Sequence, residues 1–72
     1  MNNKIILICG GSGTIGRAIA QLLMSQEYSI RILTRKKSTK IPYEQYAWDP
    51  YAGYIEKGAL DGVYGVINLA GA

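Results

Sequence analysis

The feature that most constrains this sequence is a cluster of glycines between an apolar run and a helical pattern. Residues 4–9 read Lys-Ile-Ile-Leu-Ile-Cys, a run rich in β-branched residues that is typical of a strand buried on both faces of a parallel sheet. Glycines interrupt this run within 10–13, and the spacing of apolar residues then becomes that of one helix face: Ile15, Ala18, Ile19, Leu22 and Leu23. We expect this helix to begin at Thr14 and to end near Glu27.

The remainder of the chain predicts strands with short connections. A second strand over 29–34 completes a strand-helix-strand unit, whose crossover should be right-handed. After it we expect a basic loop over 35–43, a short third strand over 46–48 and a turn over 49–53. A returning hairpin strand over 54–55, a helical turn over 56–61 and a last strand over 63–69 should follow. These elements predict an α/β fold with a Rossmann-type parallel sheet (β-α-β-β-β).

The glycines have the spacing of a phosphate-binding turn. Gly10, Gly13 and Gly16 fit the pattern G-x-x-G-x-x-G, and Gly11, Gly13 and Gly16 fit G-x-G-x-x-G. Gly10 permits the exit from the strand, Gly13 lets the backbone approach a pyrophosphate, and Gly16 allows the helix to pack closely on the sheet. A P-loop is excluded, because no Lys-Ser or Lys-Thr follows the glycines. The alternative is a glycine-rich turn without a ligand.

The start of the predicted helix favours an anion. The backbone N–H groups of Thr14 and Ile15 have no partner within the helix, and the helix dipole adds partial positive charge. Ser12 can add a hydroxyl donor. Because the motif joins a predicted strand to a predicted helix, it indicates a dinucleotide cofactor.

The end of the second strand indicates which dinucleotide binds. An NAD site has Asp or Glu about 20 residues beyond the glycines, but this sequence has no carboxylate between Glu27 and Glu44. Thr34 and Arg35 stand at that position, and a guanidinium can bind a 2′-phosphate. This favours NADP, with NAD possible. The alternative is a solvated basic loop, which is the more usual role of the lysines at 36–37.

The ends of the later strands supply further candidates. Leu69 and Ala70 follow the last strand, where small residues let a cofactor pass close to the backbone, although the same run fits a buried strand that ends in a turn. Asp49, at the end of the third strand, is a candidate acceptor for an adenine amino group. Tyr51 is expected to be a packing or surface residue.

Composition excludes several classes of site. Cys9 is the only cysteine and the chain has no histidine, so an internal disulfide, a Cys/His zinc site and a Ser-His-Asp triad are excluded. No apolar run reaches the roughly 20 residues of a membrane span. The single thiol and the lack of an export signal favour a cytoplasmic location. The net charge of +3 is mild, and five of the eight cations fall within 31–40, which does not favour nucleic acid as a partner.

The extent of the chain leads to one further expectation. A doubly wound sheet needs helices on both faces, whereas one strong helix serves three or four strands in this chain. We therefore expect residues 1–72 to be the N-terminal part of one NAD(P)-binding domain, poorly folded in isolation. The alternative is a complete small protein that forms a homo-oligomer over its open face.

The motifs together resemble a known family. Cys-Gly-Gly-Ser-Gly-Thr-Ile-Gly, Arg-Ile-Leu-Thr-Arg, Trp-Asp-Pro and Val-Ile-Asn-Leu-Ala-Gly-Ala are similar to the N-terminal part of epimerase-family proteins among the extended and atypical short-chain dehydrogenases/reductases. The resemblance implies a Rossmann fold that binds NADP or NAD. It implies a pyrophosphate at 10 and 13–15, the adenosine ribose or its phosphate at 34–35, and the cofactor along 69–70. Cys9 and Thr14 depart from the residues common in that family, Thr and Phe respectively.

Two functions from different classes follow from this resemblance. One is the cofactor-binding segment of an NADP-dependent oxidoreductase or nucleotide-sugar epimerase with an unidentified small-molecule substrate. The other is a non-catalytic NADP sensor. The family's catalytic Tyr-x-x-x-Lys does not occur in these residues, so no catalytic residue is assigned. A weaker third interpretation is an anion- or nucleic-acid-binding fragment that uses the basic residues within 31–40.

Overall fold

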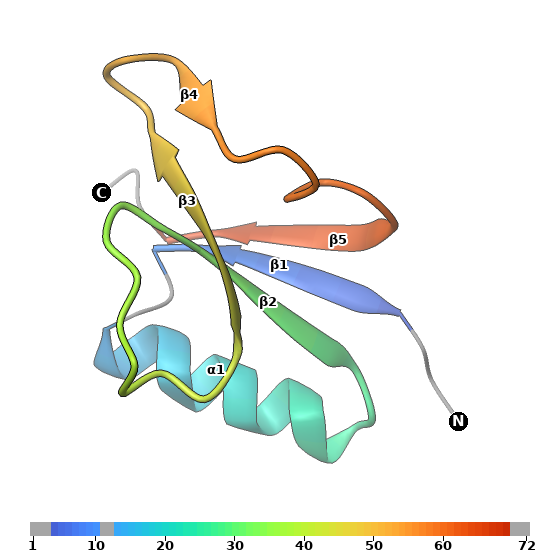
Figure 1. Ribbon diagram of the computed structural model, residues 1–72. Coiled ribbons are helices and arrows are strands. Elements are labelled where there is room, and N and C mark those ends of the chain that lie inside the picture. The colour runs from blue at the N-terminus through green and yellow to red at the C-terminus, as the bar shows by residue number, and fades with distance from the viewer. Residues whose placement is uncertain (1–3, 11–12, 70–72) are drawn as a thin grey trace.

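A sheet of five strands with one helix on one of its faces forms the described part of the chain (Figure 1). The computed structural model describes residues 4–10 and 13–69. Its elements are β1 (Ile5–Cys9), α1 (Thr14–Ser25), β2 (Ser29–Thr34), β3 (Glu44–Asp49), β4 (Tyr54–Ile55) and β5 (Val63–Asn68). The predicted α/β class with a mainly parallel sheet is confirmed.

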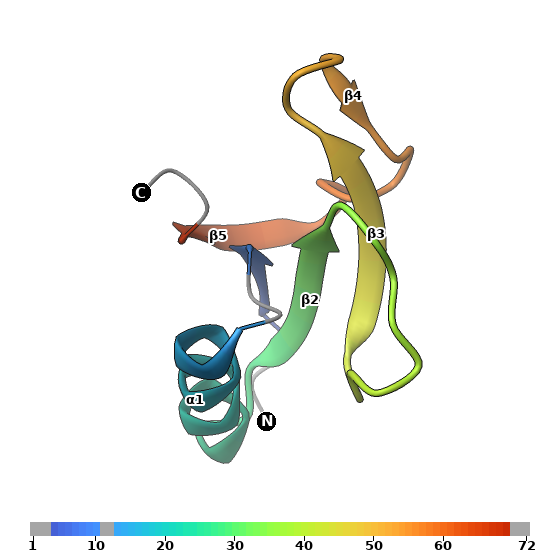
Figure 2. The same cartoon turned by 90° about the vertical axis from the view of Figure 1, so that its left-hand side faces the viewer.

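β1 lies where the order of the strands reverses: β2 and β3 follow on one side of it, and β5 lies on the other side. The order is β4-β3-β2-β1-β5. β1 pairs in parallel with β2 on one side and with β5 on the other, and β2 pairs in parallel with β3. Among the described strands, β4 alone pairs in an antiparallel direction, and the β3–β4 hairpin extends away from α1 (Figure 2). The carboxyl ends of β1, β2, β3 and β5 therefore lie at one edge of the sheet, where α/β proteins bind ligands.

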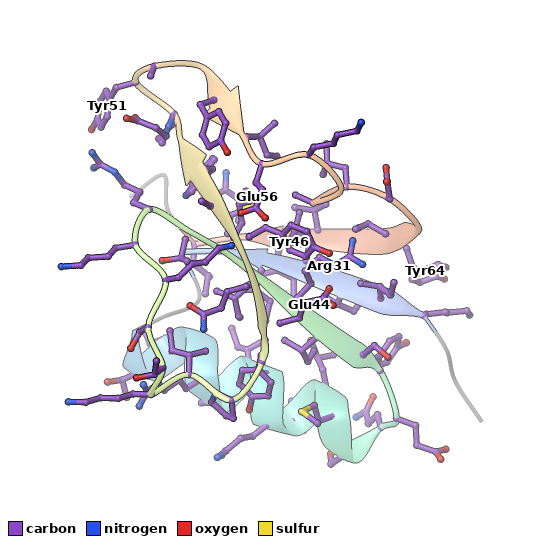
Figure 3. The ribbon with its side chains drawn as sticks, in the orientation of Figure 1. Arg31, Glu44, Tyr46, Tyr51, Glu56 and Tyr64 are labelled. Atoms are coloured by element: carbon purple, nitrogen blue, oxygen red, sulfur yellow. The ribbon has the colours of Figure 1, made fainter. Side chains whose placement is uncertain are left out.

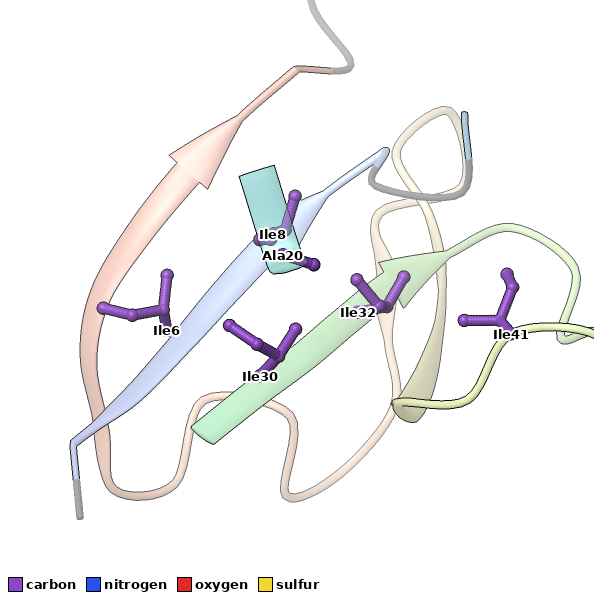
Figure 4. Packing of buried hydrophobic residues seen from close by; sticks show 6 residues of the cluster. All are labelled: Ile6, Ile8, Ala20, Ile30, Ile32 and Ile41. Carbon is purple, nitrogen blue, oxygen red and sulfur yellow. The ribbon is translucent and has the colours of Figure 1, made fainter. Parts of the chain in front are cut away.

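Apolar side chains are buried on both faces of the sheet. On the face that α1 covers, four isoleucines of β1 and β2 pack around Ala20 of the helix (Figure 4), together with Ile41: Ile6, Ile8, Ile30 and Ile32. On the other face, Leu7, Cys9 and Leu33 pack against Ala59, which lies in the connection before β5. This two-sided burial explains why the first strand is a continuous apolar run.

The helix buries only part of the expected face. Its buried residues are Gly16 and Ala20, and Ile19 and Leu23 pack beside them. Ile15, Ala18 and Leu22, which the apolar spacing assigned to the buried face, are exposed. The physical reason is the small size of Gly16 and Ala20, which lets the helix backbone approach the sheet closely at these positions.

Two other expectations need correction. The third strand runs over Glu44–Asp49 and is longer than the expected 46–48, because it pairs with β2 from Arg31 to Thr34. The segment 56–61 forms successive turns and not a helical turn. Gly58 and Gly62 have positive φ values of 92° and 71°, a conformation that breaks a right-handed helix.

Arg31 joins this connection to the sheet. It is only 8% exposed. Its Nη1 donates to the carbonyl oxygens of Ala59 and Asp61, both at 2.9 Å, and to that of Gly58 at 3.3 Å. Its Nε donates to Glu44 Oε1 at 2.8 Å, and the guanidinium lies 4.8 Å from the centre of the Tyr46 ring. Figure 3 shows Arg31, Glu44 and Tyr46 as one group.

The basic segment is consequently not one continuous cationic surface. Arg31 is buried and paired with Glu44. Lys37 Nζ lies 2.9 Å from Glu56 Oε1. Two of the five cations within 31–40 are therefore paired with carboxylates, which weakens the interpretation as a nucleic-acid-binding fragment.

Candidate functional site

The start of α1 has no side-chain cap from the described residues. Gly10 has a φ of 75°, which glycine adopts without strain, and its N–H donates to the Leu33 carbonyl oxygen at 3.1 Å. Gly13 is the N-cap of α1, with φ −84° and ψ 179°, and no side chain of the described residues caps the helix. The first turn also carries no acidic residue. A helix start that no described side chain caps, together with the helix dipole, thus favours an anion at this position.

A hollow lies in front of this helix start. It measures about 380 Å³, and we call it the glycine-loop hollow; it is lined by Gly10, Gly13, Thr14, Ile15, Gly16 and Leu69. Leu69 is fixed at its rim, because its N–H donates to the Cys9 carbonyl oxygen at 2.9 Å. A Cβ built on Gly13 would meet nothing within 4 Å. Ile15 is 71% exposed because it faces this hollow and not the core.

A second hollow of about 380 Å³ begins at Gly10 and extends toward β3. We call it the arginine hollow; it is lined by Gly10, Thr34, Arg35, Lys36, Trp48, Pro50 and Tyr51. Arg35 is exposed, and its guanidinium carbon lies 5.1 Å from the centre of the Tyr51 ring. Gly10 lines both hollows. Eight of the ten residues predicted to contact a cofactor therefore line two hollows with a common wall.

The remaining predicted contacts are Ser12 and Ala70. Both lie outside the described residues, so their positions stay predictions.

The Thr34 side chain stabilises the turn that follows β2. It is buried, its hydroxyl donates to the Lys36 carbonyl oxygen at 3.1 Å, and the same oxygen accepts the Lys36 N–H at 3.3 Å. These bonds direct the chain so that Arg35 and Lys36 both border the arginine hollow. Thr34 thus contributes by shaping the loop, and Arg35 supplies the charge.

Glu56 links Lys37, in the loop after β2, to strand β3. The Ala47 N–H donates to Glu56 Oε1 at 2.9 Å, and Lys37 Nζ lies 2.9 Å from the same oxygen. The backbone N–H of Ala47 and, after it, Lys37 lower the pKa of Glu56 below its ordinary value. Glu56 therefore favours the folded protein most when it is ionised.

This predicts an acid-dependent contribution to stability. Because the folded-state pKa is lowered, the contribution is complete above the ordinary Glu value of about 4.3 and is lost as the pH falls through the folded-state value. In Glu56→Gln, the free energy of unfolding should fall less steeply with decreasing pH in that range. Lys37→Met should show a smaller change of slope, because the Ala47 N–H remains. Denaturant unfolding of the complete protein between pH 7 and 3 measures the slopes. Identical slopes in all three proteins would contradict the prediction.

Several lining residues were not identified from the sequence. Trp48, Pro50 and Tyr51 border the arginine hollow, although the sequence indicated only packing or surface roles for Tyr51. The available signal was their position at and just beyond the carboxyl end of β3. Asp49 uses its Oδ1 to accept the N–H groups of Tyr51 and Ala52, at 3.0 and 3.3 Å, so this oxygen serves the turn.

The described residues offer few other chemical groups. Cys9 is buried, and burial raises the pKa of its thiol, which disfavours the reactive thiolate. Within 4–10 and 13–69, no three His, Cys, Asp or Glu side chains form a group that could bind a metal ion. Among the described elements, no helix has the length and apolar character needed to cross a membrane.

Comparison with known proteins identifies the family. The model of the NAD dependent epimerase/dehydratase family matches residues 6–70. Two curated relatives are epimerase family proteins of Mycobacterium bovis and Mycobacterium tuberculosis, each 31% identical over 71 residues. An epimerase family protein of Mycobacterium leprae is 31% identical over 67 residues.

These alignments cover nearly all of this chain but a small part of each relative. They include 99% of the chain and 23% of the first two relatives, and 93% of the chain and 21% of the third. The chain thus spans less than a quarter of the length of these curated relatives. No solved structure was found to match it. The family match covers the glycine turn, the strands of both hollows and the last strand, and the chain therefore belongs to the NAD dependent epimerase/dehydratase family.

Proposed function

We propose that this chain binds the dinucleotide cofactor of an oxidoreductase or nucleotide-sugar epimerase, and that it prefers NADP to NAD. The observation that carries the proposal is the pair of hollows that meet at Gly10. They lie at the carboxyl ends of the strands beside β1, where the strand order reverses. This is the crevice in which open α/β sheets bind their ligands.

The residues of the two hollows suit the two ends of a dinucleotide. In the glycine-loop hollow, the uncapped N–H groups that follow Gly13 would bind the pyrophosphate, and the absence of a side chain at Gly13 leaves room for it. In the arginine hollow, Arg35 and Lys36 would face the adenosine ribose and its phosphate. Leu69 would border the cofactor as it leaves the glycine turn. When bound, the nicotinamide supplies hydride transfer, while these residues bind and orient it.

The preference for NADP is proposed to depend on Arg35. Among the described residues that line the arginine hollow, none carries a carboxylate to accept a ribose hydroxyl, whereas one carries a guanidinium and one an ammonium. A charged hydrogen bond to the 2′-phosphate contributes about 1.5–3 kcal/mol. This corresponds to a roughly ten- to hundredfold lower Kd for NADP than for NAD.

Arg35→Ala in the complete protein should therefore lose most of the NADP preference, while the Kd for NAD changes little. Calorimetric Kd values for both cofactors test this directly. Arg17→Ala is the matched control, because it removes an exposed guanidinium from α1 outside both hollows. Raising the salt concentration should also reduce the preference. A ratio near one in both the wild type and Arg35→Ala would contradict the assignment of NADP.

A further inference from the structure

Tyr51 combines high exposure with a specific contact. The residue is 87% exposed, and it lies at the outer tip of the β3–β4 hairpin, away from the group around Arg31 (Figure 3). An aromatic ring in such a position contributes little to a core. Yet its ring centre lies 5.1 Å from the Arg35 guanidinium carbon, within the range of a cation–π interaction.

The turn that carries Tyr51 is fixed by its own hydrogen bonds. Asp49 Oδ1 accepts the N–H groups of Tyr51 and Ala52. Gly53, with a φ of 70°, then returns the chain into β4. The hairpin therefore presents the Tyr51 ring from one side of the arginine hollow, and the loop after β2 presents Arg35 from another.

We propose that Tyr51 is a positioning residue that holds the Arg35 guanidinium at the arginine hollow, so that the β3–β4 hairpin helps to set the preference for NADP over NAD. This inference rests on the proposed function. It adds a residue that does not need to touch the cofactor but determines where the phosphate-binding charge lies.

The reason is the conformational freedom of an exposed arginine. A free Arg side chain must lose rotamer freedom when it binds a phosphate, and this loss weakens binding. The Arg35 guanidinium lies over the Tyr51 ring, and a guanidinium that stacks on an aromatic ring keeps the N–H groups at its edge able to donate. NAD has no 2′-phosphate, so the contact should affect its binding very little.

The test compares Kd values for NADP and NAD in Tyr51 variants of the complete protein. A cation–π contact at an exposed site contributes about 0.5–1 kcal/mol, so Tyr51→Ala should reduce the NADP preference by about two- to fivefold. Tyr51→Phe keeps the ring and should keep the preference. Tyr54→Ala is the matched control, because Tyr54 is an exposed tyrosine of the same hairpin that does not line the arginine hollow.

A double-mutant cycle links the effect to Arg35. In the Arg35→Ala background, adding Tyr51→Ala should leave the ratio of the two Kd values unchanged, since the group that Tyr51 positions is gone. An additive effect in that background would overturn the inference. Equal losses of NADP and NAD affinity in Tyr51→Ala would also overturn it, because they would mean that the ring stacks on the adenine that both cofactors share.

The inference and the proposed function fail in different ways. If the wild type binds NADP and NAD equally, the NADP preference itself is absent. If the preference exists and depends on Arg35, but Tyr51→Ala leaves it unchanged or increases it, only the positioning role of Tyr51 is wrong. An increase would mean that the ring draws Arg35 away from the phosphate.

Discussion

Replacing Arg31 with alanine is expected to lower the free energy of unfolding by about 2–4 kcal/mol. Arg31 is the buried donor to three carbonyl oxygens of the connection before β5, those of Gly58, Ala59 and Asp61. Without it, these carbonyl groups lose a hydrogen-bond donor. The packing of Ala59 against Leu7 and Leu33 also loses the hydrogen bond that holds Ala59 in place. Denaturant unfolding of the complete protein measures the loss.

Two further variants separate the carbonyl bonds from the ion pair. The Glu44 side chain is 58% exposed, so Glu44→Gln should cost at most about 1 kcal/mol. Arg17→Ala removes an exposed arginine and should change stability by less than about 0.5 kcal/mol. If Arg31→Ala costs no more than Glu44→Gln, the bonds to the connection contribute little, and Arg31 does not hold the connection on the sheet.

The elements that the sequence predicts well are those in which local pattern and tertiary contacts agree. The second strand was predicted over 29–34 and is observed over the same residues. The first strand differs by one residue at its start, and α1 begins at the predicted Thr14. In each case a period of apolar residues is bounded by glycine or polar residues, so the pattern alone determines the boundary.

The helix face and the segment 56–61 show where pattern is insufficient. Apolar spacing gives weight to large side chains such as Ile15 and Leu22, whereas the distance between helix and sheet is set by the small residues Gly16 and Ala20. In 56–61, Gly58 has a positive φ value, and Arg31 donates to the carbonyl oxygens of Gly58 and Asp61. Those bonds join residues about 30 positions apart, which no local rule can anticipate.

The candidate site divides in the same way. The glycine turn and Arg35 have motif signals, because their positions relative to the strand ends are fixed by the strand-helix-strand unit. Tyr51 has no such signal: its contact with Arg35 depends on the hairpin that folds beside the loop after β2. The role of Arg31 was also hidden, because in sequence it belongs to the same basic segment as Arg35.

Gly13→Val is expected to remove most cofactor binding while leaving the fold intact. A Cβ at this position would meet nothing within 4 Å, and the φ of −84° is open to any residue. Valine is a weaker N-cap than glycine, so stability should fall by no more than about 1 kcal/mol. In the proposed complex, however, its branched side chain would occupy the space of the pyrophosphate. Displacing a neighbour in this way costs about 1–3 kcal/mol, or roughly fivefold to somewhat over a hundredfold in Kd, before any lost backbone contacts are counted.

A second valine variant, Ala18→Val, tests whether the loss of binding is specific to position 13. Ala18 is exposed and lines neither hollow, so Ala18→Val adds a similar β-branched side chain away from the proposed pyrophosphate site. It should leave the Kd values for both cofactors unchanged, and Gly13→Ala should fall between the wild type and Gly13→Val. Because both cofactors contain the pyrophosphate, Gly13→Val should weaken NADP and NAD alike, in contrast to Arg35→Ala. If calorimetry gives Gly13→Val the affinity of the wild type, the pyrophosphate does not bind at the start of α1, and the glycine turn serves only to join β1 to the helix.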